Sequence, residues 1–248
     1  MVIINKKRIQ IIISALLVGI FTFSLQIANN NQKGEKNKNQ NNEIVIQTTA
    51  TPVSGKTVVL DAGHGVPDEG AQSSNGTTEA ETNLKITLKV QNLLEQSGCN
   101  VILTRSDENA IYDLDSQTLK QKKISDIHNR VKIGNESSAD IFVSIHLNKI
   151  PQQQYYGWQC FYKPNDENSI KLAKLLQENL NKSIQKENKR VAMKLDTVYI
   201  MKHVEIPISI VECGFLSNPE EEKQLLENTY QDKLAWGIYN GIIEYFYE

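Results

Sequence analysis

Cysteine is scarce in this sequence, which has 248 residues and contains only Cys99, Cys160 and Cys213. Three scattered thiols are too few for a disulfide framework, and the absence of a C-x-x-C pair excludes a thiolate zinc cluster. A formal net charge of −2 gives no electrostatic support to a nucleic-acid-binding role. The hydrophobic fraction of 40% and the charged fraction of 23% are typical of a globular protein and exclude wholesale disorder.

Basic side chains are also few outside the N-terminal region. Residues 1–43 contain six basic and two acidic side chains. Residues 44–248 therefore contain 21 basic and 27 acidic side chains and have a net charge of −6. Direct adhesion of that acidic part to an anionic surface is therefore not expected.

The N-terminus has the pattern of an export segment. Residues 6–8 are basic, and residues 9–28 are uncharged over a length that can span a bilayer as a helix. Two alternatives stay open, an uncleaved signal anchor and a signal peptide cleaved near Ala28, where Gln26 makes a poor cleavage site. No cysteine follows, which excludes lipoprotein processing. In both cases the positive-inside rule predicts that the remaining chain lies outside the cytoplasm.

Residues 29–43 are predicted to be a flexible linker, because they contain no aliphatic or aromatic side chain that could offset the entropy of ordering. A flexible chain of this length has a root-mean-square span of about 20 Å. An anchored form would therefore act close to the membrane.

Short apolar strands alternate with amphipathic helices over residues 44–248. Strands are expected at 57–61, 100–104, 140–145, 157–162 and 206–211. Helices are expected at 79–96, 124–136, 169–184, 219–226 and 230–245. This alternation predicts a single α/β domain with a mostly parallel sheet and helices on both faces.

Two of the four histidines follow predicted strands. His64 stands in DAGHG after the first strand, and His146 stands in VSIHLN at the end of the third. Because open α/β sheets place their sites outside the carboxyl ends of parallel strands, these imidazoles can converge. Imidazole is a preferred zinc ligand, and a catalytic zinc commonly takes three protein ligands and one water.

Glutamates at element ends could complete such a site. Glu79 begins the first long helix, and Glu212 follows the last apolar strand, where a carboxylate beside a metal can act as a general base. Glu79 alone also has a structural explanation, since acidic side chains favour a first helical turn, and a lone histidine at a strand end is commonly a capping or surface residue. Glu69 and Glu81 compete with Glu79 as the third ligand.

Other candidates have weaker patterns. His128 is expected to be exposed on a polar helix, and His203 is expected in a loop that could border the site. Cys213 lacks a nucleophile's usual partners and is expected to be a small buried residue. Arg130 could anchor a carboxylate of a ligand or form a structural salt bridge.

The strings VVLDAGHG, ADIFVSIHLN and IVECGFLSNPEE, with Glu79 beginning a helix between the first two, resemble the zinc-dependent N-acetylmuramoyl-L-alanine amidases that cleave bacterial peptidoglycan. The resemblance covers about residues 56–247. It implies a six-stranded sheet, one Zn²⁺ held by His64, Glu79 and His146, and Glu212 as the catalytic carboxylate. The implied reaction hydrolyses the amide between the lactyl group of N-acetylmuramic acid and L-alanine.

The sequence departs from the family pattern at Ala62 and Val66, where Pro and Gly are frequent. Val66 is expected to narrow the space beside His64. Cell-wall-binding repeats are not recognisable, and the short single-domain form, together with KHVEIP and the segment 230–242, resembles the sporulation amidases of endospore formers.

That resemblance implies action on the spore cortex, in the space between the forespore membranes, before a deacetylase that forms muramic-δ-lactam. It also implies a sporulation lipoprotein as a partner, as in relatives from some clostridia. The alternatives are a zinc peptidase that cuts within the stem peptide, a vegetative cell-separation amidase, and a non-catalytic wall-binding protein.

Overall fold

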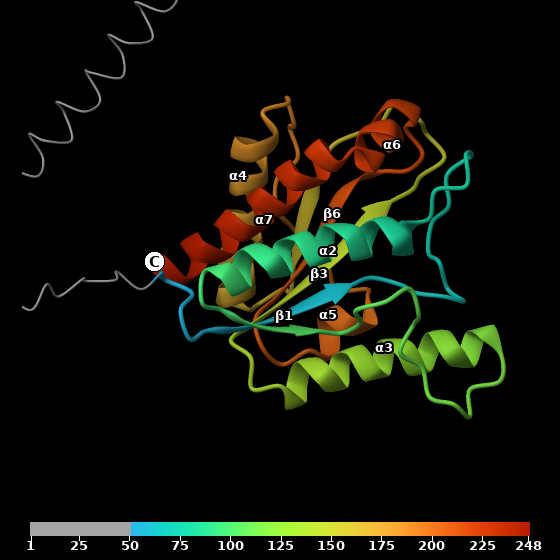
Figure 1. The fold of residues 1–248 in the computed structure, drawn as a ribbon, viewed down its shortest axis with the longest axis horizontal. Coiled ribbons are helices and arrows are strands. Elements are labelled where there is room, and N and C mark those ends of the chain that lie inside the picture. Colours follow the sequence, from blue (N-terminus) through green and yellow to red (C-terminus); the bar gives the residue numbers. More distant parts are fainter. Residues whose placement is uncertain (1–50) are drawn as a thin grey trace, which may run out of the picture. The chain divides into compact units, whose positions relative to one another are not determined.

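Six strands pair into one sheet in the computed structural model, which describes residues 51–248 (Figure 1). The strand order is β2-β1-β3-β6-β4-β5. The strands are β1 (Thr57–Ala62), β2 (Asn100–Leu103), β3 (Ile141–Asn148), β4 (Gln159–Tyr162), β5 (Met193–Lys194) and β6 (Ile208–Phe215). The expected export segment and the linker lie outside the described residues.

The pairings β2–β1, β1–β3 and β3–β6 are parallel, whereas β4 runs antiparallel to β6. The sheet is therefore mostly parallel, as the alternation of strands and helices predicts. The carboxyl ends of β1, β3 and β6 consequently meet at one edge, where an open α/β sheet places its ligands.

The described helices are α2 (Glu79–Gln96), α3 (Leu119–Glu136), α4 (Glu167–Ile184), α5 (Tyr199–His203), α6 (Pro219–Leu226) and α7 (Asn228–Tyr247). Capping side chains satisfy free N–H groups at the start of α2, α3, α4 and α6, whereas α5 and α7 begin without a side-chain cap. The Thr78 side chain accepts from the Glu81 backbone, and Thr118 and Gln121 form a capping box at α3. Among residues 51–248, no helix combines the length and apolar character that crossing a membrane requires.

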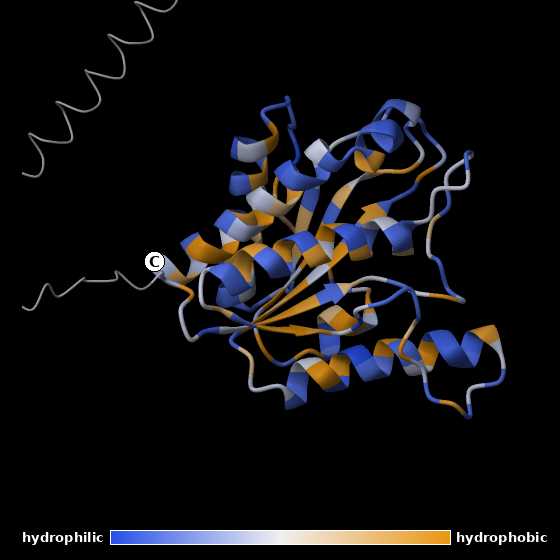
Figure 2. Cartoon of the chain, viewed as in Figure 1, coloured by the Kyte–Doolittle hydropathy of each residue, from blue (hydrophilic) through white to orange (hydrophobic). Residues whose placement is uncertain are grey.

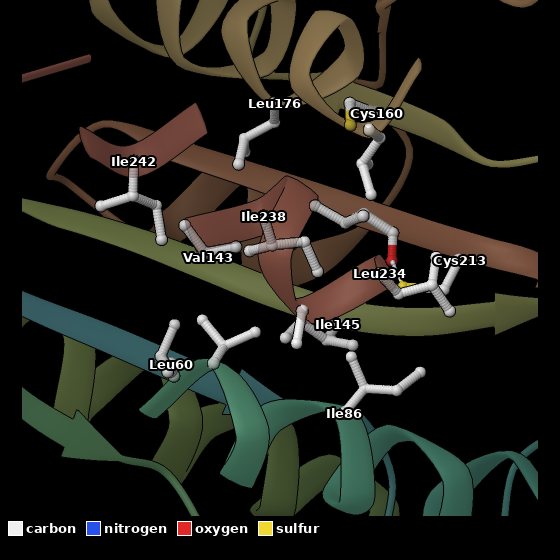
Figure 3. Close-up of a cluster of buried hydrophobic side chains, with 14 of the residues drawn as sticks. Leu60, Ile86, Val143, Ile145, Cys160, Leu176, Cys213, Leu234, Ile238 and Ile242 are labelled. Atoms are coloured by element: carbon white, nitrogen blue, oxygen red, sulfur yellow. Dashed lines mark hydrogen bonds between the residues drawn. The ribbon is translucent and has the colours of Figure 1, made fainter. Parts of the chain in front are cut away.

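Helices cover both faces of the sheet (Figure 1). One buried cluster joins α2, α4 and α7 to the sheet, and ten of its residues are labelled in Figure 3, Leu60, Ile86 and Ile238 among them. A second cluster packs α3 and α5 on the other face, around Phe142, Met201 and Ile210. Figure 2 accordingly shows hydrophobic residues along the central strands and a mixture of hydrophilic and hydrophobic residues along the helices.

Two short elements were not expected. The strand β5 has two residues and the helix α5 has five, and neither is long enough to give a periodic pattern. The expectation of a loop at His203 was therefore wrong, because this residue ends α5. Two strands also extend beyond their expected ends at residues 145 and 211. Pairing of β3 with β6 continues past His146 and Glu212 to Asn148 and Phe215.

Candidate metal centre and catalytic site

The side chains of His64, Glu79 and His146 meet at the carboxyl edge of the sheet. Their ligand atoms lie within 4.8 Å of one another, so the three residues could hold a metal ion. Glu79 Oε1 lies 2.9 Å from His146 Nδ1 and 3.3 Å from His64 Nε2. Neither competing glutamate joins this group. The Glu81 side chain is 60% exposed and pairs with Lys85, and Glu69 is exposed.

Three chain segments supply these groups. His64 follows β1, Glu79 is the first residue of α2, and His146 lies on β3. The Gly63 N–H donates to the Ile145 carbonyl at 3.0 Å, which ties the loop after β1 to β3. A Cβ atom at Gly63 would overlap the His146 ring, so only glycine lets the loop approach this imidazole.

Glu79 is oriented by several donors. Its Oε2 accepts from the Ala71 N–H at 2.9 Å, and its Oε1 accepts from the Leu147 N–H at 3.2 Å. Burial raises the pKa of Glu79, but the His146 and His64 rings outweigh burial and hold the pKa well below its usual range. The residue therefore remains an ionised carboxylate, as a metal ligand must be.

Buried polar side chains fix the loop that carries His64. Arg105 donates to the carbonyls of Ala62, Gly63 and Ala80, and Asn83 donates to the Gly63 carbonyl at 3.1 Å. These bonds join the end of β1 to the first turn of α2. The positions of the first two ligands are thus coupled through buried donors.

Arg130 is a structural residue of the same region. Its guanidinium donates to the carboxylates of Asp61 and Asp126 at 2.5 and 2.8 Å and to the carbonyls of Ala62 and His64. The side chain is 2% exposed. Of the two interpretations left open, the salt bridge is therefore correct, and Arg130 holds the His64 loop.

The carboxylate of Asp61 accepts from three side chains, the Arg130 guanidinium and the hydroxyls of Thr104 and Ser144. Burial raises the pKa of Asp61, but Arg130, His146 and the two hydroxyls outweigh burial and lower the pKa to about 2. This buried ion pair supports the loop that carries His64.

Glu212 lies beside the cluster, because it is the register partner of His146 across the β3–β6 pair. Its Oε2 atom is buried and has no hydrogen-bond partner among residues 51–248. Burial raises the pKa of Glu212 to about 7, with a smaller contribution from Glu79, against the opposing effect of the two imidazoles. A buried carboxylate oxygen without a hydrogen-bond partner destabilises the fold, and such groups are found at functional sites. A carboxylate with a pKa near neutral is suited to accept a proton.

Asp68 is a site residue that sequence reasoning missed. Its Oδ2 lies 3.4 Å from His64 Nδ1, and its Oδ1 lies 2.8 Å from Lys123 Nζ. A carboxylate on the second nitrogen of a histidine is the usual outer partner of a metal ligand, which it orients. Its position four residues after His64 was the available signal.

A cavity of about 280 Å³ opens over these residues. His64, His146 and Glu212 line it, together with the apolar side chains of Ile127, Leu195, Val198 and Ile200. A larger cavity of about 660 Å³ lies among α2, α4 and α7, and none of the cluster residues lines it. The smaller cavity is therefore the candidate active site.

The remaining candidates lie elsewhere. His128 is exposed as expected, and His203 is exposed on α5 and does not line the cavity. Cys213 is fully buried, as expected of a small core residue. Val66 is 42% exposed and lines a different cavity from the one that His64 lines.

Comparison with known proteins agrees with this geometry. The family model described as N-acetylmuramoyl-L-alanine amidase matches residues 58–244. The germination-specific N-acetylmuramoyl-L-alanine amidase of Bacillus subtilis is 37% identical over 197 residues, which cover 79% of this chain and 82% of the relative.

Solved structures have the same fold. The CwlD amidase from Clostridioides difficile, solved in complex with the GerS lipoprotein, is 45% identical with a TM-score of 0.75, covering 77% of this chain and 98% of that one. The catalytic domain of CwlV from Bacillus (Paenibacillus) polymyxa is 30% identical with a TM-score of 0.66, covering 77% and 97%. The chain therefore belongs to the N-acetylmuramoyl-L-alanine amidase family.

Proposed function

We propose that His64, Glu79 and His146 hold one Zn²⁺ and that Glu212 is the catalytic carboxylate of this amidase. Two imidazole nitrogens and one carboxylate are a set that catalytic zinc commonly takes, with one position left for water. The mutual separation of at most 4.8 Å suits a single ion. Zinc dependence is also typical of the family.

The observation that carries this proposal is the buried Oε2 of Glu212 beside His146, which has no hydrogen-bond partner among residues 51–248. Zinc, when bound, polarises a carbonyl group and lowers the pKa of water from 15.7 to about 7. Glu212 accepts the proton of the attacking water as a general base. An amide nitrogen leaves poorly until it is protonated, so the same carboxylate then returns the proton to the nitrogen of L-alanine.

In this proposal the substrate is peptidoglycan of the spore cortex. The support is the similarity to a relative named as germination-specific and to the C. difficile CwlD amidase. Removal of the stem peptide exposes the lactyl carboxylate of muramic acid. A deacetylase then acts on the product, and closure of the lactam follows, so the amidase performs the first step toward muramic-δ-lactam.

A lipoprotein partner and an extracytoplasmic location belong to the same proposal. The partner is supported by the C. difficile complex with the GerS lipoprotein. The location is supported by residues 6–28, which have the pattern of an export signal or anchor. Fractionation of a spore-forming host during sporulation tests the location, and recovery of the intact protein in the cytosol would contradict it.

The test of the reaction uses the purified full-length protein with added zinc and peptidoglycan from spores. We expect mass spectrometry of the soluble products to show free stem peptides that begin at L-alanine, and we expect a chelator to abolish their release. Products cut within the stem would instead establish a peptidase. If no peptide is released with or without the candidate lipoprotein, the amidase proposal is wrong.

A further inference from the structure

Arg190 differs from the other arginines among residues 51–248. Arg105 and Arg130 are buried, and carbonyls or carboxylates occupy their donors. Arg190 is partly exposed, and within the described part of the chain no carboxylate lies within 4.0 Å of its guanidinium. Arg190 is therefore a partly exposed cation that, within residues 51–248, contacts no carboxylate and is available to an anionic ligand.

The Arg190 guanidinium is nevertheless held in place. Its Nε donates to the Tyr156 carbonyl at 3.2 Å, and its Nη1 donates to Gln159 Oε1 at 3.1 Å. It lies over the Phe215 ring at 4.7 Å and 6.0 Å from the centre of the Tyr155 ring. Since a guanidinium has five N–H donors, three remain without a partner among residues 51–248.

The position of Arg190 relates directly to Glu212. Gln159 on β4 is the register partner of Glu212 on β6, and partners in an antiparallel pair point to the same face of the sheet. Their Cα atoms are therefore about 5 Å apart. Arg190 is hydrogen-bonded to Gln159. An extended peptide advances about 3.4 Å per residue, so a substrate peptide cleaved beside Glu212 would need only a few residues to reach the free donors of Arg190.

A cavity of about 400 Å³ adjoins this guanidinium. Tyr155 and Tyr156, 45% and 39% exposed, form one side of it. Glu221 does not neutralise the charge by contact, because its two oxygens accept from the N–H groups of Gly157 and Phe215. Glu187 and Lys189 also line the cavity and pair with each other at 3.3 Å, so the Glu187 carboxylate has its own basic partner. The cavity therefore combines the positioned Arg190 cation with aromatic side chains, which suits a carboxylate on a peptide.

We propose that Arg190 binds a carboxylate of the stem peptide, on the leaving-group side of the bond that Glu212 cleaves. This inference rests on the proposed function, because it takes peptidoglycan as the substrate. Arginine suits the role since its planar fork can donate two parallel hydrogen bonds to one carboxylate, a geometry that lysine lacks. Arg190 would then help to select acidic stems rather than take part in the proton transfers.

The test compares two peptidoglycan preparations that differ only in whether the α-carboxylate of the second stem residue is free or amidated. The wild-type protein should have the lower KM for the free acid. The change Arg190→Gln should raise KM for the acid by about tenfold or more, since hydrogen bonds between charged groups are the strong ones. The KM for the amide and the kcat for both substrates should change less than twofold.

Two further variants sharpen the test. Lys189→Gln removes a positive charge from the same cavity, from a side chain that is 89% exposed and paired with Glu187, and should leave the preference for the acid intact because Lys189 is not held in place as Arg190 is. Arg190→Lys keeps the charge but loses the fork, and should retain only part of the preference. Zinc content and thermal unfolding, measured on every variant, identify any loss that comes from misfolding.

The outcomes distinguish failure of the carboxylate subsite from failure of the proposed amidase function. Equal KM values of the wild-type protein for acid and amide would overturn the carboxylate subsite without any variant being needed. A loss in Arg190→Gln that is the same for both substrates would overturn it too. Failure of the wild-type protein to release stem peptides from either preparation would contradict the proposed function itself, and the subsite with it.

Discussion

Glu212 on β6 stands directly beside His146 on β3, as its register partner in the neighbouring parallel strand. This relationship places a carboxylate next to the group formed by His64, Glu79 and His146 without making it part of that group. One Glu212 oxygen is buried without a hydrogen-bond partner among the described residues. The two glutamates of the site therefore have different surroundings, and we expect them to respond differently to substitution.

The change Glu212→Gln should lower kcat by about 10²–10⁴, the usual contribution of a general acid–base group. The amide has nearly the same shape but cannot accept a proton from water, so zinc content should stay at the wild-type level. Peptide release and metal analysis on the same sample measure both effects. Glu205→Gln, at an exposed position, is the matched control. A Glu212→Gln rate near that of the control would contradict the catalytic role.

The change Glu79→Gln should weaken zinc binding by more than about 100-fold. Loss of a residue that only hydrogen-bonds a metal ligand typically weakens binding by about 10–100-fold, and loss of a ligand should weaken it more. The amide loses the negative charge that lies between the two imidazoles. Glu81→Gln is a close control, because Glu81 lies in the same helical turn but is exposed. Competition with a chromogenic chelator measures both affinities. Equal zinc affinities in the two variants would remove Glu79 from the ligand set.

The change Gly63→Ala should reduce zinc affinity and the free energy of unfolding together, the latter by about 1–3 kcal/mol as for other overpacked sites. The added Cβ overlaps the His146 ring and must displace it. Gly76→Ala provides the comparison, because its Cβ meets nothing within 4 Å although its φ of +90° makes the substitution strained. Gly76→Ala should therefore lose stability and keep zinc. If Gly63→Ala bound zinc normally, the close approach would have no part in metal binding.

The buried Asp61 predicts a pH dependence of stability. Its pKa is about 2 in the folded state against an ordinary 3.8, so its ionised form stabilises the fold above pH 3.8. This contribution, about 2 kcal/mol, disappears as the pH falls toward 2. Denaturant unfolding in a chelator, at several pH values, isolates this effect from metal loss.

The variant Asp61→Asn checks the assignment. It should lose about 3 kcal/mol at neutral pH, because Arg130 keeps its buried charge with one partner fewer, and its stability should vary less between pH 4 and 2. Asp232→Asn, at a surface pair that is 62% exposed, should lose less than about 1 kcal/mol. A wild-type acid dependence retained in Asp61→Asn would assign that dependence to another group.

Local signals were enough to predict α2. A capping threonine precedes Glu79 and a glycine follows the last turn, and the predicted range of 79–96 agrees with the structure. The convergence of His64 and His146 could also be predicted, since it follows from the parallel sheet. Residue type and position at the ends of strands and helices were therefore enough to predict most residues of the candidate site.

Other features depend on contacts between distant segments and leave no local pattern. Gln159 shows no motif, yet it connects Glu212 to Arg190 through strand pairing and one hydrogen bond. The role of Arg130 could not be decided from its sequence neighbours, because its partner Asp61 is 69 residues away. The steric requirement at Gly63 likewise becomes visible only when the His146 ring lies against it.

The three proposed ligands come from three separate segments, the loop after β1, the start of α2 and the end of β3. An unfolded chain cannot hold these groups together, so an ion that binds them binds the folded state alone. By mass action, free zinc at 100 times its dissociation constant would add about 2.7 kcal/mol to the free energy of unfolding. The free zinc concentration would then determine the stability of the folded enzyme as well as its activity.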